Sequence, residues 1–295
     1  MAQTQPDPFA GRVVIGVDGS EQSHDAVHWG AAYAALLGCE ATLLHTWEMP
    51  VGSVRGLGYD TRVIEDAREG AQAILDEAAR VLHEAQPDLV GHTALVPGGS
   101  VHALLGAATT ARCLVVGSRG RGALASLLLG STSDAVAARA ECPVIVVPEG
   151  ARWSDGGSVV LTSDGSPAAE AATRFAFDEA VRRQAHLEVL VTVEEPTAIA
   201  TDALYFPPDM AKVLAESHDL LDRSLAPVRA EHPDVDVEVE AIEGSLEETV
   251  ARHSGSAALV VTGSRGRGPT LGLLAGSASR QVVAGARCPV AVVKS

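Results

Sequence analysis

The sequence predicts an α/β protein made of two tandem domains of one kind, each built on a parallel sheet. A single offset relates the two halves of the chain, since Gly117 and Gly263 stand 146 positions apart in equivalent segments. Within each half, short β-branched runs alternate with longer amphipathic segments, which is typical of strands joined by helical crossovers. The strand-like runs are apolar almost throughout, as strands buried on both faces are.

The repeat is long enough to be a domain duplication. The same offset carries Asp18 onto Asp164, Gly130 onto Gly276, and the "CPV" at residues 142–144 onto residues 288–290. Solenoid repeats are far shorter. A segment rich in Gly, Ser and Pro at residues 148–158 marks the boundary. We therefore expect domains over residues 1–150 and 151–295.

The elements of the first half follow in order from local signals. Ser20 is placed to cap the first helix and Gly38 to end it. Apolar residues recur at helical spacing from Ile64 to Leu82 in the second helix. Crossovers between the parallel strands should be right-handed. The expected strands are residues 11–18, 40–47, 92–96, 113–117 and 143–148, and the expected helices are residues 20–38, 63–85, 100–110 and 131–140.

Composition excludes several classes of protein. A net charge of −16, with 22 basic against 38 acidic residues, argues against a nucleic-acid surface, which needs clustered basic side chains. No apolar run is long enough to span a bilayer, and the first residues lack the layout of a signal peptide. The four cysteines form no CxxC pair and are expected to be buried thiols. We expect a soluble, cytoplasmic protein without membrane insertion.

Glycines and hydroxyl residues gather where strands should end. Asp18 follows the first strand and Gly117 the fourth, and doubly wound sheets bind ligands at such carboxyl ends. Glycine lets main-chain N–H groups approach a ligand, so a side chain at Gly117 should occupy the place of a phosphate. Gly130 and Ser131 open the last helix, whose first N–H groups suit an anion. This arrangement predicts a phosphate site, with Asp18 suited to a ribose hydroxyl or Mg²⁺.

The glycine spacing excludes two common nucleotide loops. A Walker A loop needs a lysine after its last glycine, and no "GK" occurs in the chain. In a GxGxxG loop the third glycine would fall at Ala125. What remains is G-x2-G-x9-G-S at Gly117, Gly120 and Gly130-Ser131, repeated in the second half. Together with "GVDGS" and "CPVIVV", this resembles the ATP-binding subgroup of the universal stress protein family, as two tandem domains that cover essentially the whole chain.

The resemblance implies a Rossmann-like, five-stranded parallel sheet in the order 3-2-1-4-5, flanked by helices, in each domain. It implies ATP as the ligand, with Mg²⁺ as a candidate ion, and a homodimer formed through the last strands. The candidate residues of the first domain are Gly16, Val17, Asp18, Thr46, Gly117, Ser118, Arg119, Gly120, Arg121, Gly122, Gly130, Ser131, Thr132 and Ser133. Those of the second are Ser163, Asp164, Thr192, Gly263, Ser264, Arg265, Gly266, Arg267, Gly268, Gly276, Ser277, Ala278 and Ser279.

Some of these residues also have purely structural interpretations. Gly122 and Gly268 are equally typical of turns, and Ser133 and Ser279 of an ordinary first helical turn. His24 and His28 lie one helical turn apart, but the second copy has Glu170 and Arg174 there, so no metal site is predicted.

Two classes of function fit the resemblance: a regulatory ATP-binding module in the stress response, with an unidentified protein partner, or a slow ATP hydrolase or phosphotransferase. Chemistry on a γ-phosphate needs a positioned base and usually a metal-binding constellation. Each crevice has one acid and no lysine near its glycine loop, and no GxSxG motif occurs. The sequence therefore favours the regulatory module.

The two sites are expected to be unequal. The residue two before the acid is Gly16 in the first copy and Thr162 in the second, and Pro269 stands in the second glycine loop. A β-branched side chain should hinder close approach of the adenosine. We expect the second site to bind ATP about tenfold more weakly.

Overall fold

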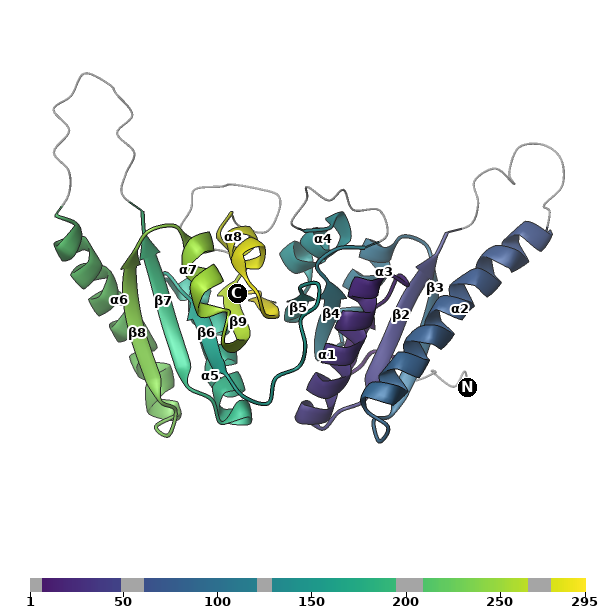
Figure 1. Ribbon diagram of the computed structural model, residues 1–295, viewed down its shortest axis with the longest axis horizontal. Coiled ribbons are helices and arrows are strands. Elements are labelled where there is room, and N and C mark those ends of the chain that lie inside the picture. The colour runs from purple at the N-terminus through teal and green to yellow at the C-terminus, as the bar shows by residue number, and fades with distance from the viewer. Residues whose placement is uncertain (1–6, 49–60, 121–128, 195–208, 265–276) are drawn as a thin grey trace, which may run out of the picture. The chain divides into compact units, whose positions relative to one another are not determined.

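The computed structural model describes residues 7–48, 61–120, 129–194, 209–264 and 277–295. The chain divides into two compact units, Met1–Trp153 and Ser154–Ser295. Each unit is an α/β domain with a central sheet (Figure 1).

The first unit has five parallel strands in the order β3-β2-β1-β4-β5. Right-handed crossovers that run in opposite directions along a sheet place their helices on opposite faces. One face therefore carries α1 and α2, and the other carries α3 and α4. In each pair the two helices contact each other. The elements are β1 (Val13–Gly16), α1 (Glu21–Leu37), β2 (Ala41–Trp47), α2 (Thr61–Ala85), β3 (Gly91–Pro97), α3 (Ser100–Ala107), β4 (Cys113–Gly117), α4 (Ser131–Arg139) and β5 (Val144–Val147).

The second unit repeats this topology, with strands in the order β8-β7-β6-β9-β10, all parallel. Both units therefore confirm the strand order that the resemblance implies. The elements are β6 (Ser158–Thr162), a short 3-10 turn (Pro167–Ala169), α5 (Glu170–Arg183), β7 (Leu187–Val193), α6 (Met210–Glu231), β8 (Val237–Glu243), α7 (Leu246–His253), β9 (Ala257–Gly263), α8 (Ser277–Gly285) and β10 (Val290–Val293).

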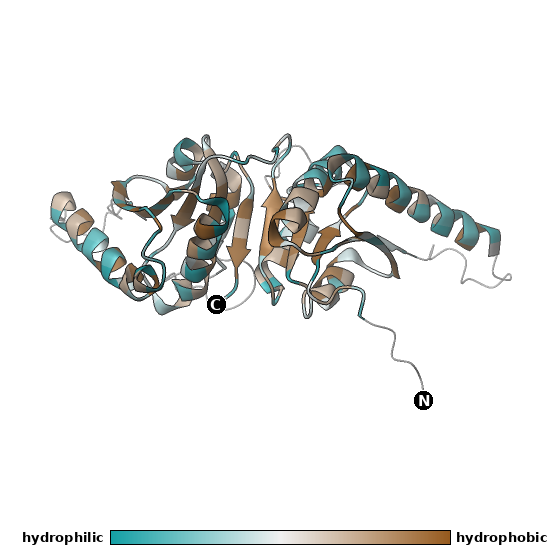
Figure 2. Ribbon diagram, turned by 90° about the horizontal axis from the view of Figure 1, so that it is seen from below, coloured by the Kyte–Doolittle hydropathy of each residue, from teal (hydrophilic) through white to brown (hydrophobic). Residues whose placement is uncertain are grey.

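Local signals in the sequence account for the ends of α1. Ser20 Oγ accepts the N–H of Ser23 at 3.2 Å, and Gly38 ends the helix with φ +61°, a conformation that glycine adopts without steric cost. The strands form the apolar centre of each unit, as their brown colour in Figure 2 shows, and every residue of β4 and β5 is buried.

An aromatic cluster joins α1 to the segment that follows β5. Trp29 and Tyr33 are each 1% exposed, and their rings stack with centroids 4.8 Å apart. The Trp153 ring lies 5.4 Å from that of Trp29. The carboxylate of Asp25 accepts the N–H of Gly150 at 2.7 Å and pairs with Arg152. The end of the first unit is thus held against α1 by both ring contacts and an ion pair.

The four cysteines are free thiols, three of them buried and Cys39 half-buried. Burial raises the pKa of Cys142 to about 11 and that of Cys288 to about 12. These two thiols therefore stay protonated at neutral pH. In the described ranges, no helix combines the length and the apolar character needed to cross a membrane.

Candidate functional site

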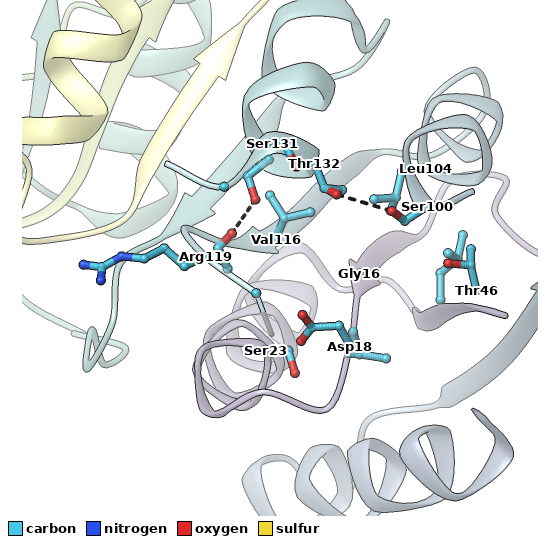
Figure 3. A pocket seen from close by; sticks show the side chains of 16 residues that line it. Gly16, Asp18, Ser23, Thr46, Ser100, Leu104, Val116, Arg119, Ser131 and Thr132 are labelled. Carbon is cyan, nitrogen blue, oxygen red and sulfur yellow. Dashed lines mark hydrogen bonds between the residues drawn. The ribbon is translucent and has the colours of Figure 1, made fainter. Parts of the chain in front are cut away.

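A cavity of about 360 Å³ opens in the first unit, where β1, β2 and β4 end and α4 begins (Figure 3). Because β1 pairs with both β2 and β4, this is the point where the strand order reverses. Open α/β sheets bind ligands at such a point, and the volume lies within the range of small-molecule sites.

Asp18 is fixed on one wall of the cavity by the turn that precedes α1. Its Oδ1 accepts the N–H of Ser20 at 3.0 Å and the hydroxyl of the same residue at 2.6 Å. Its Oδ2 faces Gly120, where an added Cβ would overlap that oxygen. The absence of a side chain at Gly120 is therefore what brings the glycine loop up to the carboxylate.

Gly117 has a packing role that the sequence does not reveal. A Cβ at this position would lie 2.9 Å from the carbonyl oxygen of Gln22 in α1, closer than real Cβ atoms approach a main-chain atom. Although Gly117 lines the cavity, it is required because α1 packs against the end of β4. The expectation that a side chain here would occupy the place of a phosphate stays a prediction.

The N-terminus of α4 forms another wall. Gly130 is the N-cap residue and offers no side chain to the first N–H groups of the helix, which have no partner within the helix. The Thr132 hydroxyl lies 3.3 Å from that of Ser100 on α3. The Ser133 hydroxyl donates to the Gly117 carbonyl at 2.6 Å and so ties α4 to β4. The arrangement offers N–H and hydroxyl donors to an anion.

The floor of the cavity is apolar and comes from the strand ends and α3. Leu44, Leu104 and Val116 contribute side chains to the lining, beside Gly16. A Cβ on Gly16 would lie 3.2 Å from Leu104 Cδ2 and 3.3 Å from Val116 Cγ1. The floor is therefore closely packed at Gly16. The carbonyl of Val17 at its margin is bound by His45 Nδ1 at 2.6 Å.

The structure brings most of the candidate residues of the first domain together around this cavity. They are Gly16, Val17, Asp18, Thr46, Gly117, Arg119, Gly120, Gly130, Ser131, Thr132 and Ser133.

Ser118 does not line the cavity, whereas Arg119 does. Ser118 is 6% exposed, is not among the lining residues, and donates its N–H to the Val147 carbonyl at 2.8 Å. The Arg119 side chain extends away from Asp18 and Thr46 in Figure 3, and its Nε is buried without a hydrogen-bond partner in the described part of the chain. Arg121 and Gly122 lie outside the described residues.

Sequence reasoning missed several lining residues. Ser100 opens α3 at the same edge of the sheet as α4, so the start of this helix after the third strand was a signal for it. Ser23 lies one helical turn after the Ser20 cap. The apolar ones occur within runs of similar residues, where nothing in the sequence distinguishes a cavity wall from the core. The missed residues are Ser23, Leu44, Ser100, Leu104 and Val116.

In the second unit, the described candidate residues occupy the equivalent places. Asp164 Oδ1 accepts a hydrogen bond from the main-chain N–H of Ser166 at 2.9 Å. The Ser163 hydroxyl oxygen accepts one from the main-chain N–H of Gly165 at 3.2 Å. Ser264 and Ser279 are 6% and 2% exposed. Thr192 lies on β7, Gly263 ends β9, and Ser277 and Ala278 open α8. Candidate residues outside the described ranges are Arg265, Gly266, Arg267, Gly268 and Gly276.

Comparison with known proteins agrees with the duplicated fold. The model of the universal stress protein family matches residues 10–148 and again residues 157–294. A universal stress protein of Mycobacterium tuberculosis strain H37Rv is 35% identical over 289 residues, covering 96% of each chain. One from Mycolicibacterium smegmatis is 34% identical over 290 residues, again with 96% of each chain.

Among solved structures, the crystal structure of a universal stress protein from Archaeoglobus fulgidus superposes with a TM-score of 0.69, covering 97% of each chain. At 21% sequence identity, that likeness concerns the fold. The double match of the family model and the full-length relatives establish the family. The chain belongs to the universal stress protein family.

Proposed function

We propose that the cavity of the first unit binds ATP and that the protein is a regulatory nucleotide-binding module. The observation that carries the proposal is that Asp18, an apolar floor and the uncapped N-terminus of α4 all line one cavity. A nucleotide has three parts that match these walls. The base suits the floor formed by Leu104 and Val116, a ribose hydroxyl suits the Asp18 carboxylate, and the phosphates suit the donors at Ser131 and Thr132.

Mg²⁺ fits this site as an ion that arrives with the nucleotide. Asp18 is the one acid among the described residues that line the cavity. Mg²⁺ is commonly held by one or two carboxylates together with phosphate oxygens and water. A single carboxylate beside a phosphate site is therefore enough for a magnesium–nucleotide complex.

The binding proposal is tested on the full-length protein by two measurements. Denaturation of protein as purified should release an adenine nucleotide, which chromatography identifies. Calorimetric titration of stripped protein should give a Kd for Mg-ATP in the micromolar range, about −8 kcal/mol. Asp18→Ala should weaken binding, whereas Asp155→Ala, at an exposed residue, should not. Absence of binding at millimolar ATP would contradict the proposal.

ATP turnover should be slow, which separates a regulatory module from an ATP-consuming enzyme. No lysine and no second acid line the described cavity, so no described side chain in the wall is placed as a base beside Asp18. We expect no more than a few turnovers per hour in a steady-state phosphate-release assay. A rate near the enzyme median of about 10 s⁻¹, lost in Asp18→Ala, would establish the enzyme instead.

A further inference from the structure

The two units differ by a matched exchange of sizes at the floor of the cavity. The first strand of the two units ends at Gly16 and at Thr162. Leu104 approaches Gly16 from the third helix, and Val250 is the residue at the equivalent position of the second unit, 146 positions later, as Thr162 is for Gly16. A Cβ on Gly16 would lie 3.2 Å from Leu104 Cδ2, so a side chain at this position requires Leu104 to give way. The second unit has the shorter valine, and there Thr162 and Val250 are 7% and 0% exposed.

The exchange also changes the polarity of the floor. Thr262 of β9 stands where the first unit has Val116, and Thr162 and Thr262 are direct partners in the pairing of β6 with β9. Thr262 is 3% exposed. The second unit therefore has two nearly buried hydroxyl side chains where the first has glycine and valine, and the apolar surface suited to a base is lost.

At the rim, in contrast to the floor, the second unit is less polar than the first. Ser23, Ser100 and Thr132 line the cavity of the first unit. The corresponding residues of the second unit are Ala169, Leu246 and Ala278. These three described positions of the second unit therefore carry no hydroxyl donor, where the proposed function needs donors for phosphates.

The acid is also held differently. In the first unit the Ser20 hydroxyl donates to Asp18 at 2.6 Å. In the second, Ser166 is followed by a 3-10 turn that begins at Pro167. Its Oγ is buried and has no hydrogen-bond partner among the residues that the structure describes. Ser166 Oγ therefore does not donate to Asp164 in the way that Ser20 Oγ donates to Asp18.

From these differences, we infer that each chain binds one nucleotide, in the first unit, and that Thr162 with Val250 closes the floor of the second. This inference rests on the proposed function and deepens it, since it names the pair of positions that decides which copy binds. The Gly16–Leu104 pair leaves the floor apolar, and the Thr162–Val250 pair puts a polar side chain in the same place.

The test transfers the pair from the second unit into the first. The full-length, nucleotide-stripped protein is titrated with Mg-ATP by calorimetry as wild type, as the double variant Gly16→Thr/Leu104→Val, and as Thr162→Val. The last variant is the matched control, because it changes the same position in the other copy with little change in volume. Thermal unfolding of the double variant shows whether the valine accommodates the threonine.

We expect one equivalent of ATP per wild-type chain, at least a tenfold loss of affinity in a folded double variant, and unchanged binding in Thr162→Val. Two equal equivalents in the wild type would overturn the inference while supporting the proposed function. Retained affinity in the double variant would also overturn it, by showing that the pair does not decide binding. Absence of any ATP binding by the wild type would instead remove the proposed function itself.

If the double variant does not fold, the single variant Gly16→Ala takes its place. It adds only the Cβ that would lie 3.2 Å from Leu104 Cδ2, and the same loss of affinity is expected on a smaller scale. An affinity equal to that of the wild type would overturn the inference.

Discussion

Replacing Gly120 with valine should reduce the affinity for ATP by at least about a hundredfold, or 2.8 kcal/mol. Even a Cβ at this position would overlap Asp18 Oδ2, and that carboxylate is held in place by two hydrogen bonds from Ser20. The variant must therefore displace either the acid or the glycine loop, and both are walls of the cavity. Calorimetry on the full-length protein measures the loss.

The matched control for this change is Gly70→Val. Gly70 lies in α2, and a Cβ there meets no atom within 4 Å, so binding should be unchanged. Gly117→Val is unsuitable as a probe of binding, because its side chain would collide with the main chain at Gln22 and destabilise the unit. Wild-type affinity in Gly120→Val would show that the cavity walls do not hold the nucleotide.

Replacing Trp29 with alanine should destabilise the first unit by about 3–5 kcal/mol, as for other large buried aromatic side chains. Trp29 is 1% exposed and stacks on Tyr33, and the Trp153 ring lies against both of them. The substitution leaves a cavity at the centre of this cluster and removes one of the ring contacts that hold Trp153 to α1. The free energy of unfolding is measured in urea.

The signal for this experiment comes from the first unit alone. All three tryptophans of the chain, Trp29, Trp47 and Trp153, lie in it, so tryptophan fluorescence follows that unit even where the two units unfold separately. Val90→Ala is the control, because Val90 is 53% exposed and its truncation should change stability by less than about 0.5 kcal/mol. A loss below about 1 kcal/mol for Trp29→Ala would contradict the packing described here.

Local chemistry explains which features the sequence could predict. The cap at Ser20, the stop at Gly38 and the apolar runs of the strands act over a few residues, and the structure confirms them. Given the strand order implied by the resemblance, Asp18 and Gly117 had to meet, since β1 and β4 end at the same edge.

Features that depend on contacts between distant segments could not be predicted. The reason for a glycine at position 117 is the main chain of Gln22, which comes from another element. Leu104 belongs to the cavity wall only because α3 packs over the end of β1, and no local pattern separates it from its apolar neighbours. The direction of the Arg119 side chain depends likewise on its surroundings in the folded unit.

The exchange between positions 16 and 104 restricts how either copy of the domain can evolve. Starting from glycine with leucine, threonine alone is overpacked, at a cost of about 1–3 kcal/mol, whereas valine alone leaves a small void at a cost of about 1 kcal/mol. The path with the smaller loss of stability therefore replaces leucine with valine before it replaces glycine with threonine. In the reverse direction, glycine must be restored before leucine. Each copy is separated from the other by a less stable intermediate. Once duplicated domains have diverged at such a coupled pair, single mutations no longer interconvert them, and the difference between the two copies is preserved.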